Sequence, residues 1–320
     1  MDVLSEVLQQ VRLNGAILFR AELSAPWCIA ARPETAIAEL IVPRAMHLIS
    51  FHVVLDGCLW ARLGPAPAQC VRQGEVLIVP HGHAYTIGDA PQGEPVPAAE
   101  LFGDTPLSQL RSFAWGGGGA PTRVMCGYLS CERSAFAPLF AALPPLFKVR
   151  LQGSAVAPSL DPLLAYTEQE ILSPRPGAEG LRLRMAELMF VEALRRYMES
   201  LPEVESGWLA GLRDPLVGRA LALLHGAPQR PWTVDELARD LATSRSRLAE
   251  RFKQTVGEPP MQYLSRWRIL LAARRLRECR DSVAMVAESV GYDSPAAFQR
   301  SFKRCMGTTP ARWRHDDVLQ

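Results

Sequence analysis

The spacing of hydrophobic positions divides the chain into a strand-rich first half and a helical second half. Near the N-terminus, hydrophobic residues at helical spacing precede Asn14-Gly15 and predict an amphipathic helix within the first 20 residues, packed on the adjoining strands. Beyond it, short β-prone runs alternate with turn residues as far as about residue 151, and Asp56-Gly57 predicts a hairpin turn. Many short strands joined by Gly- and Pro-rich connections favour a β-barrel or sandwich over a parallel α/β sheet. The predicted strands cover residues 16–23, 46–55, 58–63, 75–79 and 124–129.

Two stretches interrupt these strands. Residues 90–106 are rich in Pro, Gly and acidic side chains and predict a mobile surface loop. The four glycines at 116–119 predict a flexible turn, because no Gly-Lys-Ser/Thr follows as it would in a phosphate-binding loop.

After Pro144-Pro145 the hydrophobic spacing becomes helical, with helices expected at 161–172 and 180–200 and a linker at 201–211. These helices are expected to join two domains or to pair with a second subunit.

The C-terminal third contains an internal repeat. In the first copy, Thr233 and Glu236 form a capping box for a short helix, and Ala242-Thr243 makes a turn into a second helix at 244–256. The same hydrophobic pattern returns 49 to 50 residues later, with Gly291-Tyr292 at the turn. The second helix of this copy has Ser294 as N-cap and Pro295 at its first position, and it ends at Gly307. Two such copies predict a pair of helix-turn-helix units.

Charge and helix length favour DNA as the partner of this repeat. From Leu209 to Gln320 the chain has 19 Lys and Arg against 12 Asp and Glu, a net charge of +7, whereas the remainder carries 16 and 21, a net charge of −5. A basic part joined to an acidic part indicates a polyanionic partner for one end only. Residues 261–279 contain no Pro or Gly and predict a helix about 28 Å long. That length is comparable to one turn of DNA, about 34 Å, so both units could meet adjacent major-groove faces.

These residues resemble the AraC/XylS family of bacterial transcription regulators. The resemblance is carried by Trp232–Leu241, Ser244–Gly257, Pro259-Pro260, Tyr263, Arg266-Trp267-Arg268, Val286-Ala287, Val290-Gly291-Tyr292 and Phe298–Phe302 with Pro310. It implies two recognition helices in successive major grooves of promoter DNA, with RNA polymerase as a further partner, and it leaves activation or repression open. Glu250 either accepts from a cytosine amino group or pairs with a surface neighbour. By position, the DNA-binding residues are Arg245, Ser246, Arg247, Ala249, Glu250 and Arg251 in the first helix, Ser294, Ala296, Gln299 and Arg300 in the second, and Arg266, Arg268 and Lys303 at phosphates.

The first half resembles a cupin-type sensor domain. Gly74 to His83 is similar to the second cupin motif, and Phe51 to Gly57 is similar to the first strand pair of that fold. The resemblance implies a barrel that binds a small-molecule effector or a divalent metal such as zinc. Tyr85 replaces the family's metal-binding histidine, and the glutamate of the first motif is missing, so no cofactor is certain. The candidate effector or metal residues are His47, His52, His81, His83, Tyr85 and Cys126. Alternatively, the histidines line a polar rim, or Cys126 or another cysteine is a thiol sensor.

The chain is therefore expected to be an α+β multidomain protein with a cupin-like β-barrel, a helical linker and an all-α domain with two helix-turn-helix units. The expected divisions are residues 1–152, 153–208 and 209–316. Seven cysteines without a C-x-x-C pair, no membrane-length apolar run and no signal sequence predict a cytoplasmic protein with reduced thiols. The predicted function is effector-controlled transcription regulation without catalysis, with a homodimer as a further expectation. The alternative is a metal-dependent cupin enzyme with an accessory helical domain.

Overall fold

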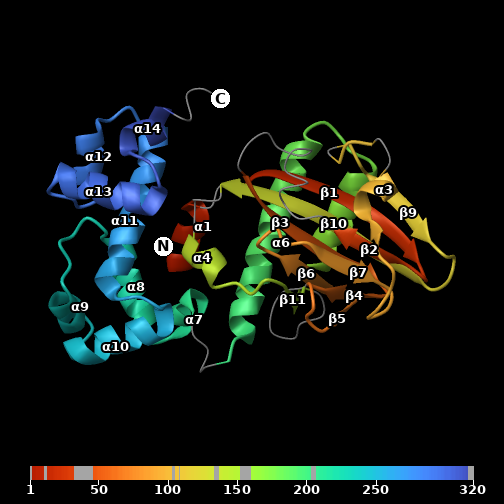
Figure 1. Ribbon diagram of the computed structural model, residues 1–320, viewed down its shortest axis with the longest axis horizontal. Coiled ribbons are helices and arrows are strands. Elements are labelled where there is room, and N and C mark those ends of the chain that lie inside the picture. The colour runs from red at the N-terminus through yellow and green to blue at the C-terminus, as the bar shows by residue number, and fades with distance from the viewer. Residues whose placement is uncertain are drawn as a thin grey trace. The chain divides into compact units, whose positions relative to one another are not determined.

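The computed structural model describes residues 2–10, 13–31, 46–102, 105–107, 109–132, 137–151, 160–202 and 207–315. The chain forms two compact units that alternate along the sequence (Figure 1). The barrel unit comprises Leu13–Arg133 and Leu143–Ser200, and the helical unit comprises Met1–Arg12, Ser134–Ala142 and Leu201–Gln320. The predicted domains are continuous stretches of sequence, whereas each of these two units is made of separate segments of the chain.

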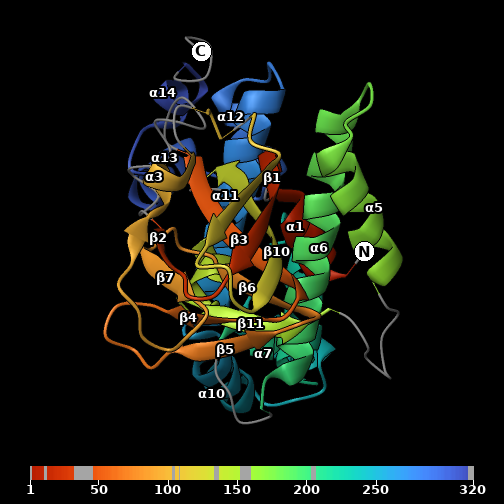
Figure 2. The same ribbon diagram turned by 90° about the vertical axis from the view of Figure 1, so that its right-hand side faces the viewer.

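The barrel unit consists of two sheets of mostly antiparallel strands, which confirms the expected cupin-like, sheet-rich architecture (Figure 2). The six-stranded sheet has the order β11 (Phe147–Arg150), β6 (Glu75–Val79), β3 (Met46–Asp56), β10 (Pro121–Glu132), β1 (Leu13–Ser24) and β9 (Ser112–Gly116). The five-stranded sheet has the order β5 (Gln69–Arg72), β4 (Cys58–Arg62), β7 (Tyr85–Gly88), β2 (Cys28–Ala31) and β8 (Val96–Pro97). Gly57, with φ +77°, makes the predicted tight turn between β3 and β4.

The two sheets enclose a hydrophobic interior because alternate residues of each strand face inward. Leu48 and Val54 of β3, Leu59 of β4 and Val124 of β10 belong to this buried cluster. The other face of the six-stranded sheet is covered by α5 (Asp161–Leu172) and α6 (Ala178–Ser200), which contact β1, β10 and β11 (Figure 2). The six-stranded sheet therefore has one face toward the hydrophobic interior and the other face against α5 and α6.

Two local predictions are wrong in this half. The first helix, α1, covers only Val3–Gln10, and β1 begins at Leu13 and runs through Asn14-Gly15, because these residues lie on the long β1–β10 ladder. The 90–106 segment is not only a loop. It contains β8, which pairs with β2, and α3 (Ala98–Phe102), which packs on β2 and β9.

In the helical unit, α1 packs on α8 and α11 through the buried side chains of Val3, Leu4 and Val7. Part of the expected linker, residues 208–211, lies in α7, so that expectation is wrong there. No described helix is long and apolar enough to cross a membrane. Besides α1 the unit contains α4 (Ala137–Ala141), α7 (Trp208–Arg213), α8 (Val217–Gly226), α9 (Val234–Asp240), α10 (Arg245–Val256), α11 (Pro260–Glu278), α12 (Val283–Ser289), α13 (Pro295–Met306) and α14 (Pro310–His315) (Figure 1).

Candidate nucleic-acid interface

The repeat predicted from the sequence is present in the structure down to the helix caps. Both α10 and α13 have 12 residues and begin after a serine. The Ser244 hydroxyl accepts a hydrogen bond from the Arg247 N–H at 3.2 Å, and the Ser294 hydroxyl accepts one from the Ala297 N–H at 3.3 Å. Both helices end at a glycine in the left-handed conformation, Gly257 or Gly307.

The helix that precedes each of these is also capped by a side chain. At α9, the Glu236 N–H donates to the Thr233 hydroxyl at 3.2 Å, and the Thr233 N–H donates to the Glu236 carboxylate at 2.9 Å. This is the predicted capping box. At α12, the Ser282 hydroxyl accepts from the Met285 N–H at 3.2 Å. The caps hold the start of both supporting helices, which position the turns before α10 and α13.

The two exposed helices, α10 and α13, are each anchored by an aromatic contact with the helix that follows. The contacting residues of the two copies lie 50 positions apart in the sequence. Phe252 of α10 meets Tyr263 of α11 edge to face, with ring centroids 5.8 Å apart. Phe302 of α13 meets Trp313 of α14 in the same manner at 6.2 Å. Both phenylalanines are fully buried. The two units thus hold their second helices against the protein with the same kind of contact.

A buried polar network lies behind α10. The Trp208 indole N–H donates to the Tyr263 hydroxyl at 2.8 Å, and that hydroxyl lies 2.7 Å from Nε2 of His225. Nδ1 of His225 lies 3.3 Å from the carboxylate of Glu6 on α1. Burial lowers the pKa of His225 to about 3, so its ring is neutral at neutral pH. The consistent assignment is that Tyr263 donates to Nε2 and that the ring hydrogen is on Nδ1, which lies near the Glu6 carboxylate but makes no hydrogen bond to it.

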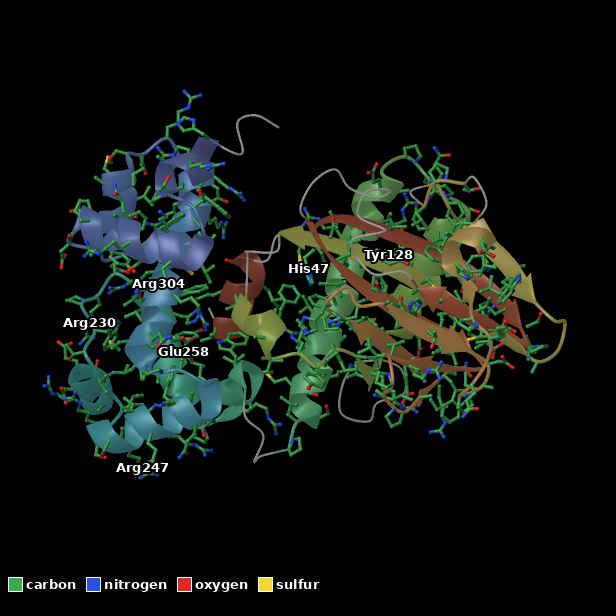
Figure 3. The ribbon with its side chains drawn as sticks, in the orientation of Figure 1. His47, Tyr128, Arg230, Arg247, Glu258 and Arg304 are labelled. Carbon is green, nitrogen blue, oxygen red and sulfur yellow. The ribbon has the colours of Figure 1, made fainter. Side chains whose placement is uncertain are left out.

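The exposed face of α10 is basic, but its arginines differ in how they are held. Arg245 pairs with Asp235 at 3.1 Å, and Arg251 pairs with Asp214 at 2.7 Å. Arg247 is exposed, points away from its unit (Figure 3) and forms no ion pair among the described residues. The Glu250 carboxylate accepts from the Gln254 amide at 3.1 Å, which matches the surface alternative for this residue. The remaining predicted residues of this helix are Ser246, which is exposed, and Ala249, which is half-buried.

The second helix, α13, presents a face with fewer partners. Ala296, Gln299 and Arg300 are all exposed. Lys303 and Arg304, the latter labelled in Figure 3, are exposed in the following turn. Among the described residues, none of these three basic side chains forms an ion pair. A cation without an internal partner is available to bind a phosphate or a base edge.

Two of the arginines assigned to phosphates are engaged within the protein. The Arg268 guanidinium donates to the carbonyl oxygens of Pro228 at 2.6 Å, Arg230 at 2.7 Å and Gly291 at 3.0 Å. These bonds use all three of its nitrogens, so Arg268 has a structural role in the helical unit, and its phosphate contact stays a prediction. Arg266 forms an ion pair with Glu258, which offsets part of its charge. The pattern of basic residues along α11 contained no signal that would have separated these roles.

The barrel interior brings together three of the predicted effector residues. His52 lies between Cys126 and Tyr85, with Nδ1 3.0 Å from the Cys126 sulfur and Nε2 2.6 Å from the Tyr85 hydroxyl. The Tyr85 hydroxyl also bonds to Ser50, and Tyr128 is buried beside Cys126. Burial lowers the pKa of His52 to about 4 and raises the pKa values of Tyr85, Cys126 and Tyr128. All of these groups are therefore uncharged at neutral pH.

The other predicted histidines lie elsewhere. His47, labelled in Figure 3, faces the opposite side of β3 from His52 because strand residues alternate. Its Nε2 bonds to the Pro80 carbonyl. His81 bonds to the Leu143 carbonyl at 3.0 Å, and its ring lies 5.6 Å from that of His83. Among the described residues, no group of three or more His, Cys, Asp or Glu side chains is arranged to hold a metal ion.

Comparison with known proteins assigns both halves. A family model described as a cupin matches residues 2–199, and a model described as a helix-turn-helix domain matches residues 237–316. A protein of Streptomyces antibioticus described as an AraC-like transcription regulator is 33% identical over 98% of this chain and 98% of its own length. The chain belongs to the AraC-like transcription regulators. A second protein so described, from Streptomyces lividans, is 39% identical over 77% of this chain and 80% of its own length. The HTH-type transcriptional regulator AlkR of Acinetobacter baylyi is 26% identical over 98% of this chain and 99% of its own length.

As an AraC-like regulator, the protein is a DNA-binding transcription regulator, and the network behind α10 supports its DNA-binding unit. Sequence reasoning aligned Tyr263 with Trp313 but did not identify Tyr263 as the centre of that network. It also missed Tyr128 and Ser50 in the barrel. Alternation along β3 and β10 places Ser50 and Tyr128 on the same strand faces as His52 and Cys126, and this signal would have found them.

Proposed function

We propose that this AraC-like regulator reads promoter DNA by placing α10 and α13 in successive major grooves. The observation that carries the proposal is the pair of equally capped, equally anchored 12-residue helices in one helical unit. The 19-residue helix α11 lies between them in the sequence and is about 28 Å long. That length is comparable to the repeat of the major groove along one face of DNA, about 34 Å.

The side chains of the two helices support different kinds of contact. In α13, Arg300 would bind a guanine edge through two hydrogen bonds and Gln299 an adenine edge, while Ala296 would meet a thymine methyl group. Lys303 and Arg247 would contact phosphates, together with Arg266 once its pairing with Glu258 is exchanged. Arg245 and Arg251 are held by aspartates, so each would bind DNA only by exchanging one ion pair for another. The second helix therefore provides most of the sequence discrimination.

Replacing Arg300 by alanine tests this assignment. Arg300→Ala is expected to reduce the preference for the cognate site over a single-base variant by about 5- to 150-fold, because one bidentate base contact contributes about 1–3 kcal/mol. The matched control is Lys303→Ala, in the next turn of the same helix. It is expected to weaken binding to all sequences alike and to lower the dependence of affinity on salt. Binding is measured by fluorescence anisotropy at several salt concentrations, and an unchanged site preference in Arg300→Ala would contradict the groove assignment.

Control by an effector in the barrel is the second part of the proposal. The cluster of His52, Tyr85, Cys126 and Tyr128 supplies uncharged hydrogen-bonding groups within a hydrophobic interior. Such a surface suits an uncharged small molecule with one hydrogen-bonding group better than an anion, because these four side chains carry no positive charge. The side chains already bond to one another, so a ligand has to exchange those bonds for its own. This favours an organic effector over zinc at the same residues.

The remaining partners are inferred from the surface and from the role in transcription. Tyr166, Leu172 and Leu188 of α5 and α6 are large hydrophobic side chains that are 38–49% exposed, which supports pairing of two copies through these helices. A transcription regulator bound at a promoter acts on RNA polymerase, which we include as the protein partner. In this scheme the chain acts by binding and not as an enzyme.

A further inference from the structure

Three of the seven cysteines lie on the outer face of the five-stranded sheet. In β4, Leu59 and Ala61 face the barrel interior, so Cys58, Trp60 and Arg62 face outward. In β5, Val71 faces inward and Cys70 faces outward, and in β2, Cys28 is also on the outer face. The function proposed for the barrel interior does not involve this face.

Cys58 and Cys70 are neighbours on that face. Cys58 pairs with Arg72 and Trp60 pairs with Cys70 in the β4–β5 ladder, so the two cysteines are diagonal neighbours on adjacent strands. Their side chains are in hydrogen-bonding contact. Cys58 is exposed and Cys70 is partly exposed, and both are free thiols. Reagents in solution can therefore reach a pair of touching thiols.

Side chains from outside the hairpin hold the backbone of both cysteines. The Thr122 hydroxyl of β10 donates to the Cys58 carbonyl at 3.2 Å. The Lys148 ammonium of β11 donates to the Cys70 carbonyl at 2.7 Å and pairs with Glu75 at 2.9 Å. These contacts fix the two strands at the cysteines and reduce the conformational freedom that closing a disulfide would otherwise remove.

The other five cysteines lie in different surroundings. Cys126 and Cys131 are buried, and Cys126 bonds to His52. Cys28 is packed against Gly93, and a Cβ added at Gly93 would lie 2.9 Å from the Cβ of Cys28. In the helical unit, Cys279 is the C-cap of α11 and Cys305 lies in α13. The geometry thus selects one pair out of seven thiols.

We propose that Cys58 and Cys70 form a redox-active dithiol that a small disulfide oxidant converts to an intramolecular disulfide. With oxidised glutathione, the Cys58 thiolate attacks one sulfur, the glutathione S–S bond breaks and one glutathione thiolate leaves. The Cys70 thiolate then attacks the Cys58 sulfur of the mixed disulfide and releases the second glutathione. The protein loses two electrons and two protons, and these convert one oxidised glutathione to two glutathione thiols.

Rotation of the two side chains is the movement that brings the sulfurs from contact to bonding distance. Burial and the neighbouring Cys70 raise the pKa of Cys58, while the Arg72 guanidinium opposes them. The attacking thiolate is therefore scarce at neutral pH, and exchange is expected to take hours rather than seconds. This chemistry is independent of DNA binding and of the effector.

The test is to oxidise the full chain with a series of glutathione buffers, block the remaining thiols with N-ethylmaleimide and map peptides by mass spectrometry. The number of blocked cysteines is expected to fall from seven to five, with a cross-linked peptide pair that contains Cys58 and Cys70. Cys28→Ser, on the same face, is the matched control and should still lose two thiols. Cys58→Ser and Cys70→Ser should each abolish the cross-link and leave a glutathione adduct on the other cysteine.

Three results would overturn the proposal. They are a wild-type chain that keeps seven free thiols, a cross-link between other cysteines, and glutathione on Cys58 that Cys70 never displaces. All three are read from the wild-type chain, so a variant that folds poorly does not obscure the answer. Circular dichroism of the oxidised chain, with the signal of the reduced chain as reference, shows that the cross-link forms in the folded protein.

Discussion

The substitution Tyr263→Phe removes a single hydroxyl group, yet it is expected to destabilise the DNA-binding unit strongly. The Tyr263 hydroxyl accepts from the Trp208 indole and bonds to His225, and its side chain is 1% exposed. Phenylalanine keeps the edge-to-face contact with Phe252, so packing changes little. Two buried hydrogen bonds are lost without replacement by water, each at a cost of about 1–3 kcal/mol. The expected loss of unfolding free energy is about 2–5 kcal/mol.

Hydrogen–deuterium exchange of the full chain measures this loss in the unit concerned. Peptides from α8, α10 and α11 that exchange by unfolding of the helical unit should exchange about 30-fold faster or more, because each 1.4 kcal/mol corresponds to about a factor of ten. Barrel peptides provide an internal reference. The matched control is Tyr292→Phe, whose half-buried hydroxyl bonds to Ser265 at 3.0 Å and can be replaced by water, so a change below about 1 kcal/mol is expected. Equal effects of the two variants would refute the reasoning from burial.

The other two predictions concern titration and the effector. Because the pKa of His225 is about 3 in the folded chain and about 6.5 when unfolded, the unfolded state binds the proton first, and stability falls as the pH drops below about 6.5. The helical unit should lose about 2 kcal/mol between pH 7 and pH 5 in urea titrations followed by circular dichroism at 222 nm, a loss that His225→Gln should reduce. For the barrel, benzyl alcohol should raise the thermal midpoint while benzoate of similar size does not. An equal shift with benzoate, or a shift that survives His52→Leu, would contradict the uncharged site.

The parts of the structure that were predicted well depend on short-range chemistry. The capping box of Thr233 and Glu236, the serine cap of α13 and the glycine that ends it are all decided by residues within one or two turns. Because the same pattern occurs twice in the sequence, the helix boundaries predicted in one copy can be checked against those in the other. Hydrophobic spacing and caps therefore located α9 to α13 to within about one residue.

Contacts between distant residues explain where prediction was incomplete. Asn14-Gly15 is a turn signal by composition, yet it lies in β1 because the ladder to β10 continues past it. The strand β8 has two residues and exists only because β2 lies beside it. In the barrel, His52 and Cys126 are 74 residues apart, and no local pattern separates them from His47, which faces the other way. The candidate histidines were found by residue type, and their grouping required the fold.

The two turns of the repeat show how the helix-turn-helix units are held together. Ala242 and Gly291 occupy equivalent positions, and both have positive φ, +52° and +87°. Ala242 is exposed, so its side chain meets solvent and only the backbone conformation costs energy, about 1 kcal/mol. At Gly291, an added Cβ would lie 2.7 Å from the Gln229 carbonyl and 2.9 Å from the Arg268 guanidinium, so a side chain has no room.

That crowding has a structural cause. Arg268 binds the carbonyl oxygens of Pro228 and Arg230, which precede the first unit, and the carbonyl oxygen of Gly291 in the turn of the second. One guanidinium from α11 thus joins the chain that enters the first helix-turn-helix unit to the turn that presents α13. The spacing of α10 and α13 then depends on this bridge as well as on the length of α11. Arg268 is therefore an arginine that connects two parts of the helical unit, which the basic pattern of α11 alone did not reveal.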